Sequence, residues 1–278
     1  MRHKKYILSI SGQDPTNGAG NSLDILVANQ HNFHCLSSIT NLTIQDAEKL
    51  HKVEDVNENF FQKNLKNLNE NFNISGVKIG AISSNKIIES TSKFLDQFTK
   101  IPVVIDPIIE AGGGGKFLKK QNINFSLEKL YPQATLLTPN LNELKILSGC
   151  KTEKDSINFL LDLGIKNIFV TGKSRKNEVI STLFVNGIKE LDVKTKKISK
   201  RLGYSEALNI GVDWPPRFIK EYFTLLKRFN YWSTAGRLNC YHAGSFRAYP
   251  TNFLKFMKGF PNSNKACPIA RWIKYNIW

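Results

Sequence analysis

Short apolar runs alternate with segments of helical period through the first 200 residues, and this alternation restricts the fold more than any other feature. The runs are rich in Val, Ile and Thr and show little polar alternation, as expected for strands covered on both faces. Strands separated by helices are typical of βαβ units around a parallel sheet. We expect strands at Tyr6–Ile10, Leu36–Thr43, Gly76–Ile79, Ile101–Ile105, Thr135–Thr138 and Asn167–Thr171.

Apolar residues at helical spacing predict the helices between these strands and assign their inner faces to the core. Residues 179–193 differ, because two apolar stretches meet at Asn186-Gly187, a dipeptide preferred in tight hairpins. We therefore expect an antiparallel element after the last parallel strand. The helical stripes are Phe60, Phe61, Leu65, Leu68 and Phe72; then Ile87, Ile88, Phe94, Leu95 and Phe98; then Ile157, Leu160 and Leu161 before a stop at Gly164.

The net charge of +16 is spread unevenly along the 278 residues. Half of the excess positive charge lies after residue 204, and all four tryptophans (Trp214, Trp232, Trp272 and Trp278) lie there too. This change in composition divides the chain into a domain at 1–203 and a divergent basic, aromatic-rich tail at 204–278. The bias of the tail resembles translation in a shifted reading frame, so a frameshift or a non-homologous C-terminus is our interpretation.

Several protein classes are excluded by composition. The chain is 41% hydrophobic and 22% charged, which fits a globular protein and not a disordered or membrane-spanning one. The first apolar run is too short for the core of a signal peptide, and the four cysteines show no zinc or disulfide spacing. We expect a cytoplasmic protein without membrane contact. The basic run at 194–201 is explained by a solvated edge strand, and nucleic-acid binding is the less favoured alternative.

A glycine-rich turn, Gly12-Gln13-Asp14-Pro15-Thr16-Asn17-Gly18-Ala19-Gly20, follows the first strand and precedes a helix. Glycines allow the backbone to approach a ligand closely, and a helix N-terminus offers unpaired N–H groups. The alternative is an ordinary turn between a strand and a helix. The turn is not a Walker A loop, because no Gly-Lys-Ser/Thr follows, and Gly172-Lys173-Ser174 lacks the upstream glycine of that motif.

Taken in order, these motifs resemble one family. The SGQDPTNGAG turn, ITNLTIQD, VKIG at 77–80, VVIDP at 103–107 and TPNLNEL at 138–144 are similar to bacterial hydroxymethylpyrimidine/phosphomethylpyrimidine kinases of the ribokinase-like superfamily. The resemblance runs over about residues 5–200. It implies a three-layer α/β/α fold with a mainly parallel sheet, and transfer of phosphate from ATP to an aminopyrimidine in thiamine biosynthesis. It also implies Mg²⁺ as cofactor and a homodimer.

The resemblance assigns the substrate pocket to Gly12, Asp24, Gln45, Gly80 and Ala81. The amide of Gln45 offers one donor and one acceptor, which can match the ring nitrogen and exocyclic amine of an aminopyrimidine. Two positions depart from the family: Ala81 stands where methionine is usual, and Gln13 replaces a small hydroxyl residue. Both departures affect the expected volume and polarity of the pocket.

The nucleotide side is assigned by the same resemblance to Asn140, Glu143 and Gly172, with Glu143 and Asp106 near the metal. A carboxylate that orders Mg²⁺ and its waters is what phosphoryl transfer needs, since catalysis depends on positioning and charge neutralisation. The alternative for Glu143 is stabilisation of a helix N-terminus.

One family motif is missing. A Gly-Thr-Gly-Cys or Gly-Thr-Gly-Asp turn should follow residues 194–201, but Gly203-Tyr204-Ser205-Glu206-Ala207-Leu208 stands there. In relatives this turn supplies anion-binding N–H groups and the proton acceptor, so no catalytic residue can be assigned and we expect impaired turnover. The rival functions are a pyridoxal or pyridoxine kinase of the same superfamily and a non-catalytic, basic nucleic-acid-binding protein.

Overall fold

The computed structural model describes residues 5–30, 33–46, 49–98, 101–110, 117–118, 120–175 and 178–196. The tail after residue 203 and the expected catalytic turn lie outside these residues. The strands are β1 (Lys5–Gln13), β2 (Phe33–Gln45), β3 (Leu50–Asp55), β4 (Ile74–Ile79), β5 (Val103–Ile105), β6 (Leu136–Leu137), β7 (Asn167–Arg175), β8 (Glu178–Val185) and β9 (Ile188–Lys196). The helices are α1 (Gly20–Gln30), α2 (Glu58–Asn71), α3 (Asn85–Leu95), α4 (Lys120–Lys129), a 3₁₀ turn η1 (Tyr131–Gln133), α5 (Leu141–Ser148) and α6 (Glu153–Asp162).

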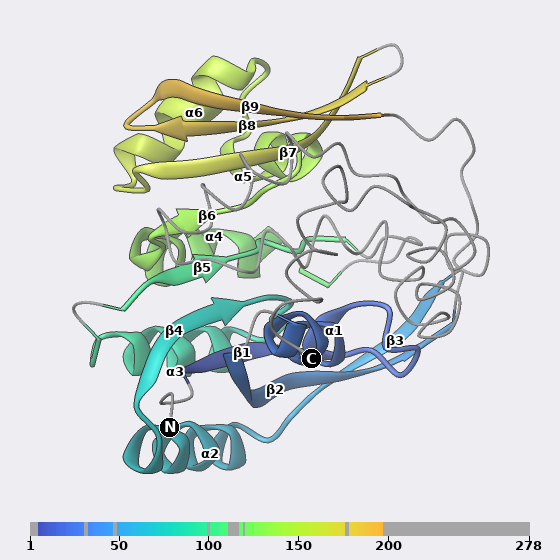
Figure 1. The fold of residues 1–278 in the computed structure, drawn as a ribbon, viewed down its shortest axis with the longest axis vertical. Coiled ribbons are helices and arrows are strands. Elements are labelled where there is room, and N and C mark those ends of the chain that lie inside the picture. The colour runs from blue at the N-terminus through green and yellow to red at the C-terminus, as the bar shows by residue number, and fades with distance from the viewer. Residues whose placement is uncertain are drawn as a thin grey trace, which may run out of the picture.

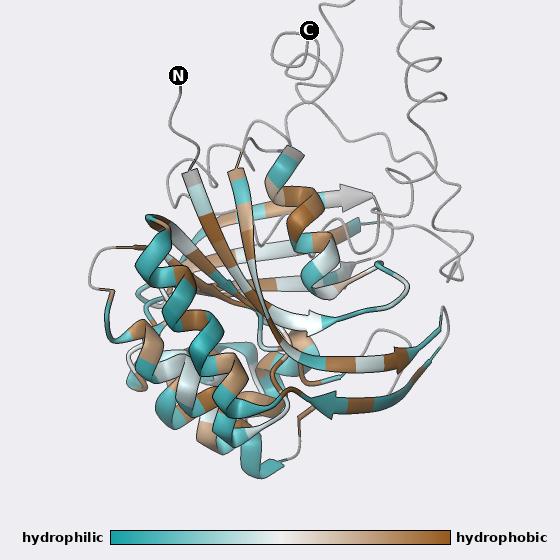
Figure 2. Cartoon of the chain, turned by 90° about the horizontal axis from the view of Figure 1, so that it is seen from below, coloured by the Kyte–Doolittle hydropathy of each residue, from teal (hydrophilic) through white to brown (hydrophobic). Residues whose placement is uncertain are grey.

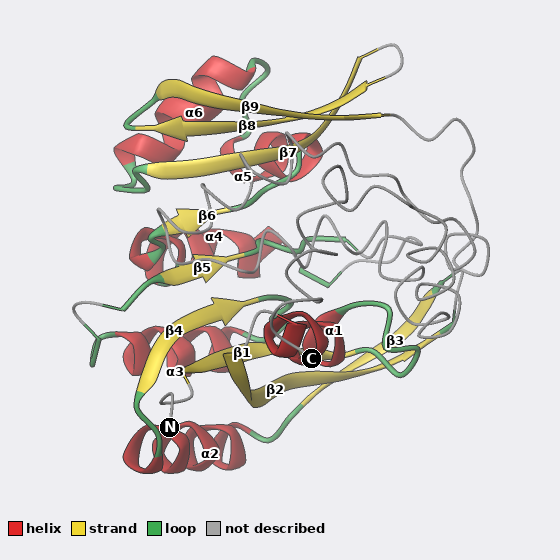
Figure 3. Ribbon diagram, viewed as in Figure 1, coloured by secondary structure: helices red, strands yellow, loops and turns green. Residues whose placement is uncertain are grey.

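The strands form one sheet in the order β3-β2-β1-β4-β5-β6-β7-β8-β9 (Figure 1). Neighbouring strands from β2 to β7 in this order are parallel. At one end of the sheet β3 is antiparallel to β2, and at the other end β8 is antiparallel to both β7 and β9. Helix α1 covers one face and the other described helices cover the opposite face (Figures 1 and 3). The expected three-layer arrangement around a mainly parallel sheet is therefore confirmed.

Neighbouring side chains of β2 illustrate how the strands serve both layers. Ser37 donates a 2.6 Å hydrogen bond to Asn21 of α1, while Ser38 on the opposite face accepts one of 3.2 Å from Asn64 of α2. Because helices cover both faces, the central strands are buried and mostly apolar, and Figure 2 shows hydrophobic residues along several strands of the sheet. None of the described helices is long and apolar enough to cross a membrane.

Most predicted elements are present, and the differences concern one core residue and the end of one strand. The hairpin turns at Asn186 and Gly187, both with positive φ (49° and 78°), as a tight antiparallel connection requires. The stripe of α2 is confirmed at Phe61 and Leu65, but Phe60 is 68% exposed, so its assignment to the core was wrong. Strand β7 extends past the expected end at Thr171, because its pairing with β8 continues to Arg175.

Candidate active site

The predicted pocket lies where the chain reverses its direction of winding through the sheet. From β1 the chain moves outward to β2, and β4 then returns to the other side of β1. The carboxyl ends of β1 and β4 therefore flank the switch point, which is the usual ligand-binding position in open α/β sheets. Gly12 is the penultimate residue of β1 and Gly80 follows β4, and the N–H of Gly80 donates a 2.9 Å bond to Ile10 O. The structure thus brings Gly12 and Gly80 together.

The turn at residues 12–20 is organised by the buried carboxylate of Asp14. One oxygen accepts from the backbone and hydroxyl of Thr16 (2.8 and 2.7 Å), and the other accepts from the N–H groups of Gly18 (3.1 Å) and Ala19 (2.9 Å). The N–H groups of Gly18 and Ala19, just before α1, are therefore already paired with Asp14. These bonds hold the turn in place from within.

Asp24 lies in α1 beneath this strand end, where it forms a buried ion pair. Its Oδ2 accepts a 2.8 Å bond from Lys78 Nζ and a 2.6 Å bond from Ser9 Oγ, and both charged side chains are almost completely buried. Burial raises the pKa of Asp24 above its ordinary value of 3.8, while Lys78 opposes that rise. Both of these bonds end on Oδ2, so the ion pair fixes Asp24 through one oxygen.

Ser11 and the end of the Lys78 side chain leave little room for a side chain at position 80. A Cβ at Gly80 would lie 2.8 Å from Lys78 Nζ and 2.3 Å from Ser11 Oγ, closer than side-chain atoms approach. Lys78 was not predicted from the sequence. A single charge inside the apolar run GVKIG was the available signal, because a lysine buried in a sheet needs a charged partner.

Gln45 ends β2, and Ala81 follows the end of β4. Thr43 donates a 2.9 Å bond to Gln13 O, and the half-buried Gln45 lies on the same side of β2 as Thr43. The carbonyl of Ala81 accepts a 2.6 Å bond from Thr40, which joins β2 to the end of β4. The substrate-side residues thus gather at the carboxyl ends of β1, β2 and β4.

The nucleotide-side residues also meet at one place. Asn140 and Glu143 form a reciprocal cap on α5: Asn140 Oδ1 accepts from Glu143 N (2.9 Å), and Glu143 Oε2 accepts from Asn140 N (2.8 Å). The alternative role of Glu143, stabilisation of a helix N-terminus, is therefore observed. A parallel bridge from Asn140 to Thr171 places Gly172 beside this cap.

Asp106 follows β5, between the two groups of residues, and its N–H donates a 2.8 Å bond to Ile79 O. The oxygen donors of Asp106, Asn140 and Glu143 suit Mg²⁺, which commonly binds through one or two carboxylates and completes its shell with waters and phosphates. No group of three His, Cys, Asp or Glu side chains that could hold a metal occurs within the described ranges. A fully protein-made metal cage is thus not present there.

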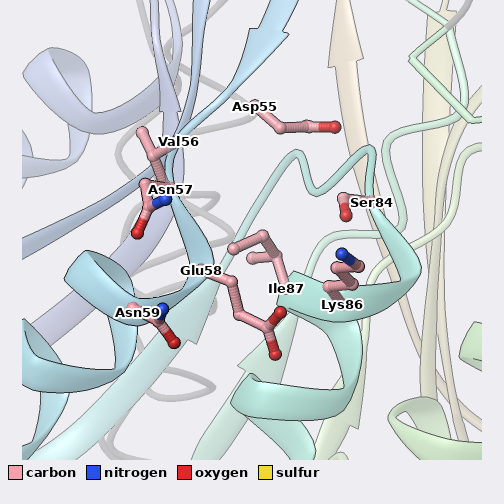
Figure 4. Close-up of a pocket in the computed structure, with 8 residues that line it drawn as sticks. All are labelled: Asp55, Val56, Asn57, Glu58, Asn59, Ser84, Lys86 and Ile87. Atoms are coloured by element: carbon pink, nitrogen blue, oxygen red, sulfur yellow. The ribbon is translucent and has the colours of Figure 1, made fainter.

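A separate cavity of about 300 Å³ opens beside the first turns of α2 and α3 (Figure 4). Its lining includes Asp55, Glu58, Ser84 and Lys86, and none of the predicted site residues contributes to it. Both acidic and basic side chains line this cavity, so its charge does not favour one class of ligand. The candidate site at the switch point is therefore separate from this cavity, and it is defined by hydrogen bonds and by the order of the strands.

Comparison with known proteins gives a consistent assignment. The family model for phosphomethylpyrimidine kinase matches residues 14–203, more than two thirds of the chain. The hydroxymethylpyrimidine/phosphomethylpyrimidine kinase of Aquifex aeolicus is 27% identical over 69% of this chain and 77% of its own length. The enzyme of the same name from Haemophilus influenzae is 29% identical over 62% of this chain and 66% of its own length. Pyridoxine kinase from Bacillus subtilis is 27% identical over 64% of this chain and 69% of its own length.

Solved structures establish the fold. Phosphomethylpyrimidine kinase from Clostridium difficile 630 aligns with a TM-score of 0.64 at 24% identity, over 81% of this chain and 99% of that one. An ADP complex of B. subtilis pyridoxal kinase aligns with a TM-score of 0.63 at 24% identity, over 71% and 78% of the two chains. The fold is thus ribokinase-like, and by the family match the chain belongs to the phosphomethylpyrimidine kinase family, a family of phosphotransferases.

Proposed function

We propose that this chain binds 4-amino-5-hydroxymethyl-2-methylpyrimidine or its monophosphate and Mg-ATP for phosphoryl transfer in thiamine biosynthesis. One observation carries the proposal: two groups of family-matched residues lie along the carboxyl edge of one sheet. Gly12, Asp24 and Gly80 lie at the switch point, and Asn140 and Gly172 lie beyond β5 at the same edge. The names of the Aquifex and Haemophilus relatives support this choice of substrate.

Each group has a distinct task in this proposal. Gln45 reads the ring edge with its amide, and Asp24, anchored through Oδ2 by Lys78 and Ser9, presents its other oxygen to the substrate. Asn140, Glu143 and Gly172 bind the nucleotide. Mg²⁺, placed by Glu143 and Asp106, neutralises charge on the phosphates. The proposed homodimer rests on the family resemblance alone.

Turnover is proposed to be impaired, because the sequence contains no Gly-Thr-Gly turn. Loss of a general base lowers a rate by about 10²–10⁴, and loss of one anion-binding donor lowers it by about 10²–10³. These effects overlap, so their product is an upper bound. Substrate binding should be affected much less than the rate.

Calorimetry of the full chain with the aminopyrimidine tests the binding part of the proposal. Gln45→Leu should lower affinity by about 5- to 150-fold, since it leaves a ligand polar group unpaired. Gln62→Leu is the matched control, because the side chain of Gln62 on α2 bonds Ser90 on α3, in the helical layer on the other face of the sheet from α1. Unchanged affinity in Gln45→Leu would refute the role of Gln45, and failure of the wild-type chain to bind the aminopyrimidine would refute the substrate.

The rival substrate is pyridoxal or pyridoxine, which the B. subtilis relative supports by its name. Competition between pyridoxal and the aminopyrimidine on the wild-type chain separates the two. Tighter binding of pyridoxal would favour the rival. Binding of DNA or RNA that weakens steeply with salt, without binding of either ring, would instead favour a nucleic-acid-binding protein.

A further inference from the structure

Asn41 lies near the end of β2 and is completely buried. Its side chain is close to the end of β1 and to the segment that follows β4. Its Nδ2 is 3.3 Å from Thr40 Oγ1, 3.2 Å from Ser83 Oγ and 3.5 Å from Ala81 O. This amide group therefore faces the segment that follows β4. The side chain lies between Gly12 and Ala81, two of the residues assigned to the substrate pocket.

The other end of the amide has no partner. Asn41 Oδ1 is buried and accepts no hydrogen bond from the part of the chain that the structure describes. It lies against Gly12, where a Cβ would approach it to 2.4 Å. Exchanging the amide oxygen and nitrogen would point an oxygen at the carbonyl of Ala81, so the observed orientation is the favourable one. The acceptor thus remains directed toward the glycine turn.

An unsatisfied acceptor is costly in a folded protein, and the cost is removed when a ligand supplies a donor. This oxygen lies against Gly12, the first residue of the turn. A carbonyl-type oxygen accepts and cannot donate, so it selects for a ligand N–H or O–H. An exocyclic ring amine is such a donor, whereas a ring nitrogen or a methyl group is not.

We propose that Asn41 is a specificity-determining residue whose Oδ1 accepts a hydrogen bond from the exocyclic amine of the ring, after a small shift of the Gly12 turn. This inference rests on the proposed function and adds to it: Asn41 reads the donor on the ring edge, separately from Gln45. Replacement by a side chain without an acceptor at this position reduces the preference for the amine, and the acceptor of Gln45 still contributes to binding of the ring.

The test compares two ligands by calorimetry: the aminopyrimidine and the same ring with hydrogen in place of the amine. Asn41→Ala should reduce the preference for the amine by about 10-fold or more. The ratio of the two affinities is informative because general loosening of the pocket weakens both ligands alike. Asn41→Ser, whose hydroxyl is too short to reach the Oδ1 position, should reduce the preference too, and it replaces the alanine variant in the test if that variant does not fold.

Thr91→Val is the matched control, because it removes a buried hydroxyl that bonds Ile87 O within α3. It should leave the ratio unchanged. If the wild-type chain prefers the amine and both Asn41 variants keep that preference, the inference is overturned while the proposed function stands. Equal wild-type affinity for the two rings also overturns it. If neither ring binds the wild-type chain, the proposed function itself fails.

Discussion

Replacement of Lys78 by methionine should destabilise the fold more than most single substitutions. Methionine matches the length of the side chain but removes the ammonium that lies 2.8 Å from Asp24 Oδ2. Only 6% of the Lys78 side chain and 3% of the Asp24 side chain are exposed, so the remaining carboxylate has little access to water. Removal of one partner of a buried pair costs about 3–5 kcal/mol. That loss is a large fraction of the roughly 5–15 kcal/mol that stabilises a typical domain.

The pH dependence distinguishes a lost charge from lost packing. Burial already raises the pKa of Asp24, and loss of Lys78 removes the main opposing effect, so the pKa rises further in the variant. The folded variant then retains a proton that the unfolded chain releases above about pH 3.8. Its free energy of unfolding therefore falls as pH rises from that value through the raised pKa, and becomes constant above it. Lowering the pH should narrow the difference from wild type.

Urea unfolding followed by circular dichroism, at neutral pH and at pH 4–5, measures both effects. Lys52→Met is the control, because Lys52 pairs with Glu54 at 2.9 Å on the surface and its loss should leave the midpoint unchanged. The double variant Lys78→Met with Asp24→Leu should recover most of the stability. A loss below about 1 kcal/mol at neutral pH, or a double variant as unstable as the single one, would refute the reasoning.

Three further outcomes are expected. Gly80→Ala should lower both the stability of the fold and the affinity for the aminopyrimidine, because the added Cβ would meet Ser11 and Lys78. Gly76→Ala is the control and should be tolerated, because the nearest atom to its Cβ is 3.5 Å away. Urea titration and calorimetry compare the two variants. Glu143→Gln should keep the cap on α5, since an amide oxygen can still accept from Asn140, but should weaken Mg-ATP binding; equal Mg-ATP affinity by calorimetry would exclude the metal role. Burial raises the pKa of Cys35 to about 12, so roughly one thiol in 10⁴ is ionised at pH 8. Alkylation of Cys35, measured by peptide mass spectrometry, should therefore be very slow. Rapid labelling would contradict this expectation.

Local patterns predicted the parallel part of the sheet well, because strands buried on both faces are mostly apolar. They missed β3, whose sequence LHKVED is mostly polar and whose only partner among the described strands is β2. An edge strand of this kind is defined by a tertiary partner and has no period of its own. The misplacement of Phe60 has a related cause, since helical spacing alone does not show where the buried face of a helix ends.

Some residues of the candidate site could likewise be predicted from the sequence, and others could not. The turn at Gly12 and the strand end at Gly80 were predictable because glycine positions leave a motif in the sequence. Lys78 and Asn41 were not, because each acquires its role from residues distant in the sequence: Lys78 pairs with Asp24, and Asn41 lies between Gly12 and Ala81. A charge or an amide inside an apolar run signals a buried partner but does not identify that partner.

The contacts that build the substrate side are independent of the segment expected to carry the catalytic turn. The hydrogen bonds of Asp14, Asp24 and Asn41 given above join residues between Ser9 and Ser83, and the strands that present them are paired with one another. A change after residue 203 removes none of these bonds. Ring binding and phosphoryl transfer should therefore be separable in this chain: affinity for the ring depends on the switch point, while the rate depends on the groups that follow β9.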